Sequence, residues 1–144
     1  MKMSIYLILV FSFLVLGGCK HKHSEQESSA QIEEVKLDQG KKWKADQQTN
    51  GGAAKLQSIV AEFSKETPKP ELEDYKRLNT QVQTELDEIF KKCTMTGDAH
   101  QQLHVFLVRI IKDVNVLKED DLKASDAAFQ SMQKNLATYT DYFE

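Results

Sequence analysis

The sequence lacks several features that mark large classes of protein. Its longest apolar run, residues 5–16, is only about a dozen residues long and is interrupted by Ser12. A permanent membrane-spanning helix needs roughly 20 apolar residues to cross a hydrocarbon core of ~30 Å, so this run is too short to be one. Basic residues are not in excess either, because 19 lysines and arginines stand against 22 aspartates and glutamates. The sequence therefore has no broad positive field for nucleic acid.

The segment around this run has the composition of a secretory signal peptide. Lys2 supplies the positive charge that precedes the hydrophobic part of such a peptide, and the run has the length that this part requires. Because signal peptides are removed during export, we expect residues 1–18 to be absent from the mature protein.

The end of the predicted signal peptide, Leu16-Gly17-Gly18-Cys19, resembles the lipobox of bacterial lipoproteins. The resemblance implies that the Cys19 thiol receives a diacylglyceryl group, with fatty acids such as palmitate, before cleavage. Small residues at positions 17 and 18 suit a peptidase that must admit extended backbone on both sides of the scissile bond. We therefore expect a cell-envelope protein that is anchored to a membrane through the lipid on Cys19.

Acylation at Cys19 and removal of the signal peptide alter the number of free cysteines and the net charge of the mature chain. Cys93 becomes the only free thiol, so the mature protein has no intramolecular disulfide and must rely on an apolar core. Removal of residues 1–18, which contain one lysine, leaves 18 basic and 22 acidic residues and a net charge of −4. Lys20 then follows the lipidated cysteine. Aspartate at that position retains lipoproteins in the inner membrane of enteric bacteria, so Lys20 predicts the outer membrane.

The mature chain is long enough for one domain. Residues 19–32 are almost free of apolar side chains and predict a flexible tether, because such a stretch buries too little surface to offset its ordering entropy. His21 and His23 in this tether could bind a metal ion, but the interpretation that we adopt leaves them free in solvent.

Residues 33–48 predict an extended arm. Val35 and Leu37 alternate with charged residues, as in a short extended segment, and turn-forming residues follow them. Trp43 then lies between lysines. We expect Val35, Leu37 and Trp43 to cover one end of the core, although a Trp flanked by Lys could instead stack on a ligand or touch a membrane.

Residues 49–144 carry four amphipathic patterns, which predict helices over 52–65, 70–93, 98–117 and 122–143. Four such helices with short connections and no strand-rich section predict an all-α fold, an up-down-up-down four-helix bundle. The predicted core comprises Leu56, Ile59, Val60, Phe63, Leu72, Tyr75, Leu78, Val82, Leu86, Ile89, Cys93, Ala99, Leu103, Phe106, Leu107, Ile110, Val114, Leu117, Leu122, Phe129, Met132, Leu136, Tyr139 and Phe143.

Local signals predict where three of these helices begin. Asn50 is a suitable N-cap for the first helix, and Pro70 suits the first position of the second. Either Asp121 or Ser125 could cap the fourth helix.

One short stretch concentrates side chains that bind metals, namely Cys93, Met95, His100 and His104. Two histidines four residues apart share one face of a helix. Thiolate, thioether and imidazole groups are ligands that copper(I) favours, and thiolate with imidazole also suits zinc. These four residues are therefore candidate ligands for copper or zinc. In the alternative interpretation, Cys93 is a buried thiol that continues the apolar stripe of its helix, and both histidines face solvent.

No catalytic motif is present. His100 and His104 have the spacing of a zinc-metalloprotease helix, but Gln101 stands where that helix requires a glutamate as general base. The sequence also has no glycine-rich phosphate loop and no Glu-x-x-His pairs of the di-iron bundles. We predict that the protein is not an enzyme and needs no cofactor beyond a possible copper or zinc ion.

Residues 42–46 and 95–104 are similar to segments of small exported helical proteins of Bacteroidetes-type bacteria. The resemblance implies no particular activity, but it draws attention to Trp43, His100 and His104. Two hypotheses about function therefore stand together. In the first, the protein is an envelope lipoprotein whose helical domain is a non-enzymatic binding module for a partner that the sequence does not identify. In the alternative, it is a metal-binding envelope lipoprotein.

Overall fold

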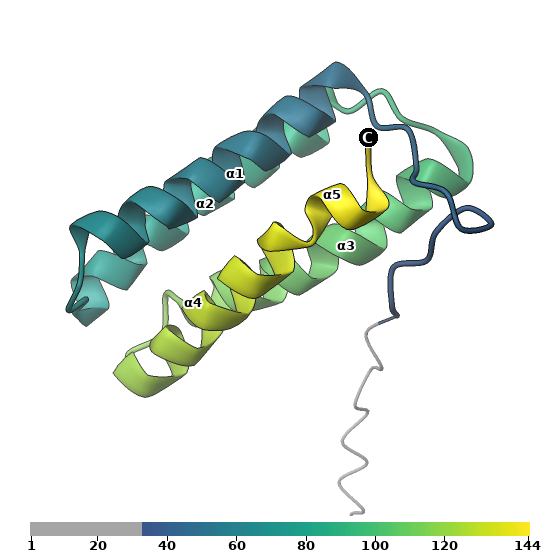
Figure 1. Ribbon diagram of the computed structural model, residues 1–144. Helices are drawn as coiled ribbons and strands as arrows, with labels where there is room; N and C mark the ends of the chain where they lie inside the picture. The colour runs from purple at the N-terminus through teal and green to yellow at the C-terminus, as the bar shows by residue number, and fades with distance from the viewer. Residues whose placement is uncertain (1–32) are drawn as a thin grey trace, which may run out of the picture. The chain divides into compact units, whose positions relative to one another are not determined.

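The computed structural model describes residues 33–144, and most of these residues are helical (Figure 1). The predicted all-α class is confirmed, because the described residues form no sheet and only isolated β-bridges. The predicted signal peptide 1–18 and tether 19–32, with Cys19, His21 and His23, lie outside the described residues. The helices are α1 (Gln47–Glu66), α2 (Leu72–Lys92), α3 (Gly97–Val116), α4 (Leu122–Ala137) and the short α5 (Tyr139–Tyr142).

The four long helices pack as two hairpins. Helix α1 lies against α2, and α3 lies against α4, while α1 also contacts α4 and α2 contacts α3. Figure 1 shows the loops 67–71 and 117–121, which close the two hairpins, at the same end of this domain. We refer to this end as the hairpin end. The opposite end, with the start of α1, the loop 93–96 and α5, is referred to as the histidine end.

Helix α1 begins earlier than its sequence pattern predicts. Asp46 caps it, since the carboxylate accepts a hydrogen bond of 2.7 Å from the backbone N–H of Thr49. The prediction of Asn50 as the N-cap is wrong. Asn50 lies within the first turn of α1, and its side-chain oxygen accepts a hydrogen bond of 2.8 Å from the hydroxyl of Tyr139. The Asp46 carboxylate, one turn before Asn50, caps the helix, and the Asn50 amide makes a tertiary contact with Tyr139.

Helices α2 and α4 also begin at acidic residues. The prediction of Pro70 as the first residue of α2 is wrong, because Glu71 is the N-cap and its backbone N–H donates a 2.8 Å hydrogen bond to Asp74. Asp121 caps α4 by accepting a 2.9 Å hydrogen bond from the N–H of Ala124. The other candidate cap of α4, Ser125, is buried instead.

The last predicted helix is interrupted. Helix α4 ends at Ala137, and the hydroxyl of Thr138 donates a 2.8 Å hydrogen bond to the carbonyl of Asn135. One further turn, α5, follows, and Phe143 is then extended. The break allows the final residues to leave the helix and run beside the arm.

The core draws side chains from every helix and from the arm. Most of the predicted stripe residues are buried or half-buried, but Leu122 is 47% exposed. The prediction that Leu37 of the arm covers the core is wrong, because this side chain is 41% exposed. Leu122 is the first residue of α4, at the hairpin end, and Leu37 lies beside the turn at 38–41 of the arm. The buried apolar residues are Val35, Ala53, Leu56, Val60, Tyr75, Leu78, Val82, Leu86, Ile89, Leu103, Phe106, Leu107, Ile110, Val114, Leu117, Ala128, Phe129, Met132, Leu136, Tyr139 and Phe143.

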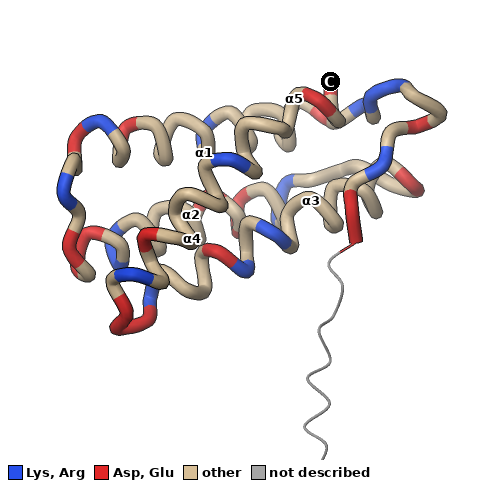
Figure 2. The backbone as a smooth tube through the Cα atoms, turned by 60° about the horizontal axis from the view of Figure 1, so that its bottom comes forward, with Lys and Arg blue, Asp and Glu red and all other residues tan. Residues whose placement is uncertain are grey.

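Charged residues of both signs are spread along the helices of this domain and are frequent in its loops (Figure 2). Within residues 33–144, no helix is long enough and apolar enough to span a membrane.

Candidate functional site

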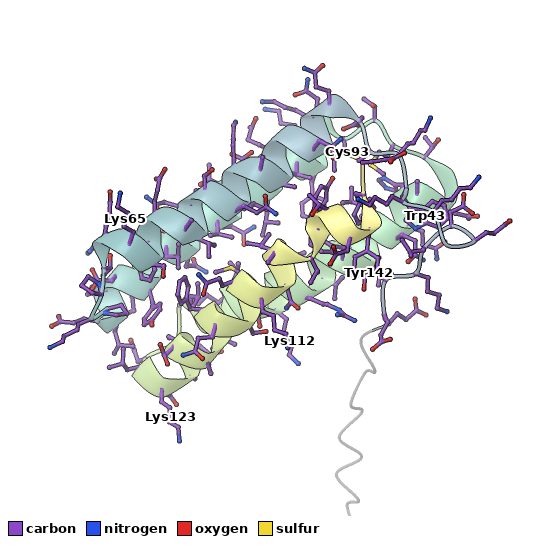
Figure 3. All side chains as sticks on the ribbon, in the orientation of Figure 1. Trp43, Lys65, Cys93, Lys112, Lys123 and Tyr142 are labelled. Atoms are coloured by element: carbon purple, nitrogen blue, oxygen red, sulfur yellow. The ribbon has the colours of Figure 1, made fainter. Side chains whose placement is uncertain are left out.

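The candidate metal ligands lie at the histidine end, where α2 passes into α3. Cys93 is the C-cap of α2, and its N–H donates a 2.9 Å hydrogen bond to the carbonyl of Ile89. Its side chain is half-buried and packs against the hydrophobic core. In Figure 3, Cys93 lies at the same end of the domain as Trp43 and Tyr142, and far from Lys65 and Lys123.

His100 and His104 occupy the first two turns of α3, and Cys93 contacts one of them. The sulfur of Cys93 lies 3.6 Å from Nδ1 of His100. The other nitrogen of the same ring, Nε2, lies 2.8 Å from Nε2 of His104. The two imidazole centroids are 4.4 Å apart, with the rings inclined at 72°. Three of the four predicted ligands are therefore in contact.

These three side chains form a row and do not surround a common point. His100 stands in the middle and uses both ring nitrogens, which point in different directions. One ion bound at Nε2 is therefore out of reach of the sulfur beside Nδ1. Consistent with this, residues 33–144 contain no group of three or more His, Cys, Asp or Glu side chains placed to hold a metal ion. Met95, the fourth predicted ligand, is half-buried and packs against the hydrophobic core.

Phe90 completes the surroundings of the histidine pair. Its ring stacks on His104 with centroids 6.0 Å apart and an interplanar angle of 29°. Phe90 belongs to the last turns of α2 and remains 42% exposed, so part of its apolar ring faces solvent. In the sequence, Phe90 lies outside the apolar stripe of α2. That position is the one feature of the sequence that indicates an exposed side chain at Phe90.

The loop 93–96 is held in place by a carboxylate from a different helix. Asp46, the cap of α1, accepts hydrogen bonds from both the N–H and the hydroxyl of Thr94, at 2.5 and 2.8 Å. Burial by itself would raise the pKa of Asp46, but the hydrogen bonds from Thr94 and Thr49 together hold this pKa well below its usual range. One ionised side chain thus joins the start of α1 to the end of α2.

Tyr139 lies close to the same carboxylate. Burial raises the pKa of its hydroxyl well above the ordinary value, and the negative charge of Asp46 raises this pKa further. The hydroxyl therefore stays protonated and donates to Asn50. Tyr139 also stacks on Phe143, with centroids 5.0 Å apart, and meets Phe106 edge-on at 5.4 Å.

The arm covers this end of the core, as the sequence predicts for Val35 and Trp43. Trp43 is partly buried, its backbone N–H donates to the carbonyl of Tyr142 at 2.7 Å, and its carbonyl accepts from the N–H of Glu144 at 2.9 Å. Its indole N–H donates to the carbonyl of Lys36 at 2.5 Å. These contacts support the interpretation of Trp43 as a residue that packs against the core.

A contact between the arm and α3 lies close to the histidines. The backbone N–H of Lys36 donates a 2.7 Å hydrogen bond to the side-chain oxygen of Gln102. Gln102 stands between His100 and His104 in sequence, so the arm is fastened to the helical turn that carries both rings. Nothing in the local pattern of the arm predicts this partner.

Comparison with known proteins adds no relative. No family model matches the chain, and no curated protein and no solved structure matches it.

Proposed function

We propose that the protein is a lipid-anchored envelope lipoprotein whose helical domain is a non-enzymatic binding module. The observation that carries the proposal is the sequence Leu16-Gly17-Gly18-Cys19 directly after a short apolar run. A lipid on Cys19 would leave the polar stretch 20–32 between the membrane and the helical domain.

The binding role is supported by the surface around His104. Phe90 stacks on this histidine, and Val108, one helical turn after it, is 48% exposed. Exposed aromatic and aliphatic groups beside polar ones are common where a protein meets a partner. The lysine at position 20 further supports location in the outer membrane.

Metabolic labelling with palmitate tests the anchor. The wild-type protein should incorporate the label and partition into the detergent phase, and Cys19→Ala should abolish both. Cys93→Ala is the matched control, because it removes the other cysteine and should leave labelling unchanged. Lys20→Asp should move the labelled protein toward inner-membrane fractions in enteric cells. Equal labelling of wild type and Cys19→Ala would refute the proposal.

We also infer that the four long helices form an up-down-up-down bundle. Gln57 donates a hydrogen bond of 2.8 Å to the carbonyl of Leu136, and the earlier Asn50 accepts one of 2.8 Å from the later Tyr139. This pairing of ascending with descending residue numbers supports antiparallel packing of α1 and the last helical segment. Cysteines at Ala61 and Gln133, which line the same groove, should form a disulfide under mild oxidation in a Cys93→Ser background, because only antiparallel helices bring these two positions together beside the Gln57–Leu136 contact. Failure of this pair to cross-link would contradict the topology.

A further inference from the structure

The two Nε2 atoms of His100 and His104 face each other at 2.8 Å across one turn of α3. A hydrogen bond between the two rings explains this distance, with one ring donating and the other accepting. The same placement also aims two imidazole nitrogens at one point on the surface of the helix. Zn–N bonds of about 2.0–2.1 Å in tetrahedral geometry separate two nitrogens by about 3.3 Å, so a widening of about 0.5 Å would admit an ion.

Each ring is held in this orientation by a different neighbour. The sulfur of Cys93, 3.6 Å from Nδ1 of His100, can accept the Nδ1–H proton. That contact favours the tautomer in which Nε2 is free of a proton and able to bind a metal. The ring of Phe90 stacks on His104 and restricts its rotation. Histidines that bind metals are commonly oriented in this way by a partner at the other ring nitrogen.

We propose that His100 and His104 form a two-histidine clamp for a zinc-type divalent ion, bound through both Nε2 atoms, with Cys93 as the orienting partner of His100 and not as a ligand. This assignment differs from a cysteine-containing copper or zinc site. The observation that favours it is the position of Cys93, which packs against the core on the far side of the His100 ring, whereas His104 is exposed. An ion reaches the Nε2 side directly from solvent.

The clamp supplies two ligands and leaves the other coordination positions to water or to a donor from outside the protein. Structural zinc sites are closed by four protein ligands, and sites that act on an exogenous molecule keep positions open. A two-histidine site is therefore suited to reversible binding of an ion. The proposal is independent of the lipid anchor, because it depends only on α2 and α3.

Zinc titration of the full chain in detergent tests the clamp, with His21→Ala and His23→Ala in every sample to remove the histidines of the predicted tether. The protein should bind one equivalent of Zn²⁺, and Zn²⁺ should raise its Tm. His100→Ala and His104→Ala should each abolish this binding and the rise in Tm. Gln101→Ala is the matched control, since it changes an exposed residue on the same turn, and it should bind zinc as the parent does.

Cobalt(II) separates the two roles of Cys93. The Co²⁺ complex should show no thiolate-to-cobalt charge-transfer band, and Cys93→Ser should still bind one ion, about tenfold more weakly because an orienting contact is altered. A charge-transfer band that disappears in Cys93→Ser would show that the sulfur is a ligand and would overturn the assigned role. Zinc binding that survives both histidine substitutions would overturn the clamp itself. Circular dichroism of each variant confirms that a loss of binding does not reflect unfolding.

Discussion

Each end of the helical domain contains a group of three packed aromatic rings, but the segments that cover the two groups are held by different interactions. At the hairpin end, Phe63, Tyr75 and Phe129 have centroid separations of 5.0–6.2 Å. At the histidine end, the group consists of Phe106, Tyr139 and Phe143, with separations of 5.0–5.9 Å. Each group includes a tyrosine whose hydroxyl donates a hydrogen bond, to Asp126 in the first case and to Asn50 in the second.

The difference lies in what covers the rings. At the hairpin end, surface ion pairs connect α2 to the loop 117–121, since Lys76 of α2 contacts Asp120 of that loop at 2.9 Å and Glu73 of its own helix at 3.1 Å. At the histidine end, the arm and the final residues exchange backbone hydrogen bonds, and Asp46 holds the loop 93–96. Salt and water weaken exposed ion pairs, whereas the backbone hydrogen bonds between the arm and the final residues do not depend on a pair of charges. The histidine end should therefore be the more rigid of the two.

The largest effect is expected for Phe143→Ala. The ring is buried, and its loss should lower the free energy of unfolding by about 3–5 kcal/mol. It should also release the arm, so that the N–H groups of Trp43 and Ala45 exchange faster with deuterium. Phe129→Ala, at the hairpin end, should cost a similar amount of stability and leave these amides protected. Equal loss of protection in both variants would show that the two ends do not act separately.

A pair of neighbouring glycines gives the next largest effect. An added Cβ at Gly52 would overlap the side chain of Ile89, whereas nothing lies within 4 Å of a Cβ at Gly51. Gly52→Ala should therefore lower the free energy of unfolding by about 1–3 kcal/mol through overpacking. Gly51→Ala should raise it by about 0.5–1 kcal/mol, because alanine favours helix. Urea denaturation measures both, and changes of the same sign would contradict the close approach of α1 and α2.

Removal of the Asp46 carboxylate should have a smaller effect that depends on pH. Asp46→Ala should cost about 1–2 kcal/mol at neutral pH, since it removes a helix cap and the contacts with Thr94. The pKa of Asp46 is lower in the folded chain than its ordinary value of 3.8. Its stabilisation is therefore complete above that value and is lost as the pH falls through the folded-state pKa.

Unfolding measured between pH 7 and pH 2 checks this sign. The difference between wild type and Asp46→Ala should stay constant down to about pH 4 and shrink at lower pH. Asp121→Ala is the matched control, because Asp121 caps α4 at the hairpin end without a contact comparable to that with Thr94. A difference that grows on acidification would contradict the hydrogen bonding assigned to Asp46.

The smallest effect is expected for Lys76→Met at the hairpin end. The lysine joins α2 to the loop 117–121 through exposed carboxylates, and such pairs are weak and screened by salt. The change in Tm should be close to the error of the measurement and should vanish in about 1 M NaCl. A large loss of stability that persists in high salt would show that the hairpin end depends on this ion pair.

Much of the candidate site was predictable because its residues lie close together in sequence. The spacing of His100 and His104 on a predicted helix requires neighbouring rings, and the short loop before α3 brings Cys93 near them. The direction of each ring nitrogen was not predictable, since it depends on contacts with Cys93 and Phe90 from α2. That direction decides whether the sulfur is a ligand of the ion or a partner of the ring.

The sequence by itself determined the all-α class and most of the buried stripes, and it narrowed the cap of α4 to Asp121 or Ser125, because periodicity and capping are properties of neighbouring residues. It also carries the resemblance on which the proposed lipid anchor rests. Only the tertiary structure decided that Asp46 and not Asn50 caps α1, that Gly52 is a point of close helix approach, and that the arm pairs with the final residues. Gly52 and the arm contact partners that lie far away in the chain, and Asn50 is held by Tyr139 in the same way, so local patterns do not record these choices. The capping bond from Thr49 to Asp46 is itself local.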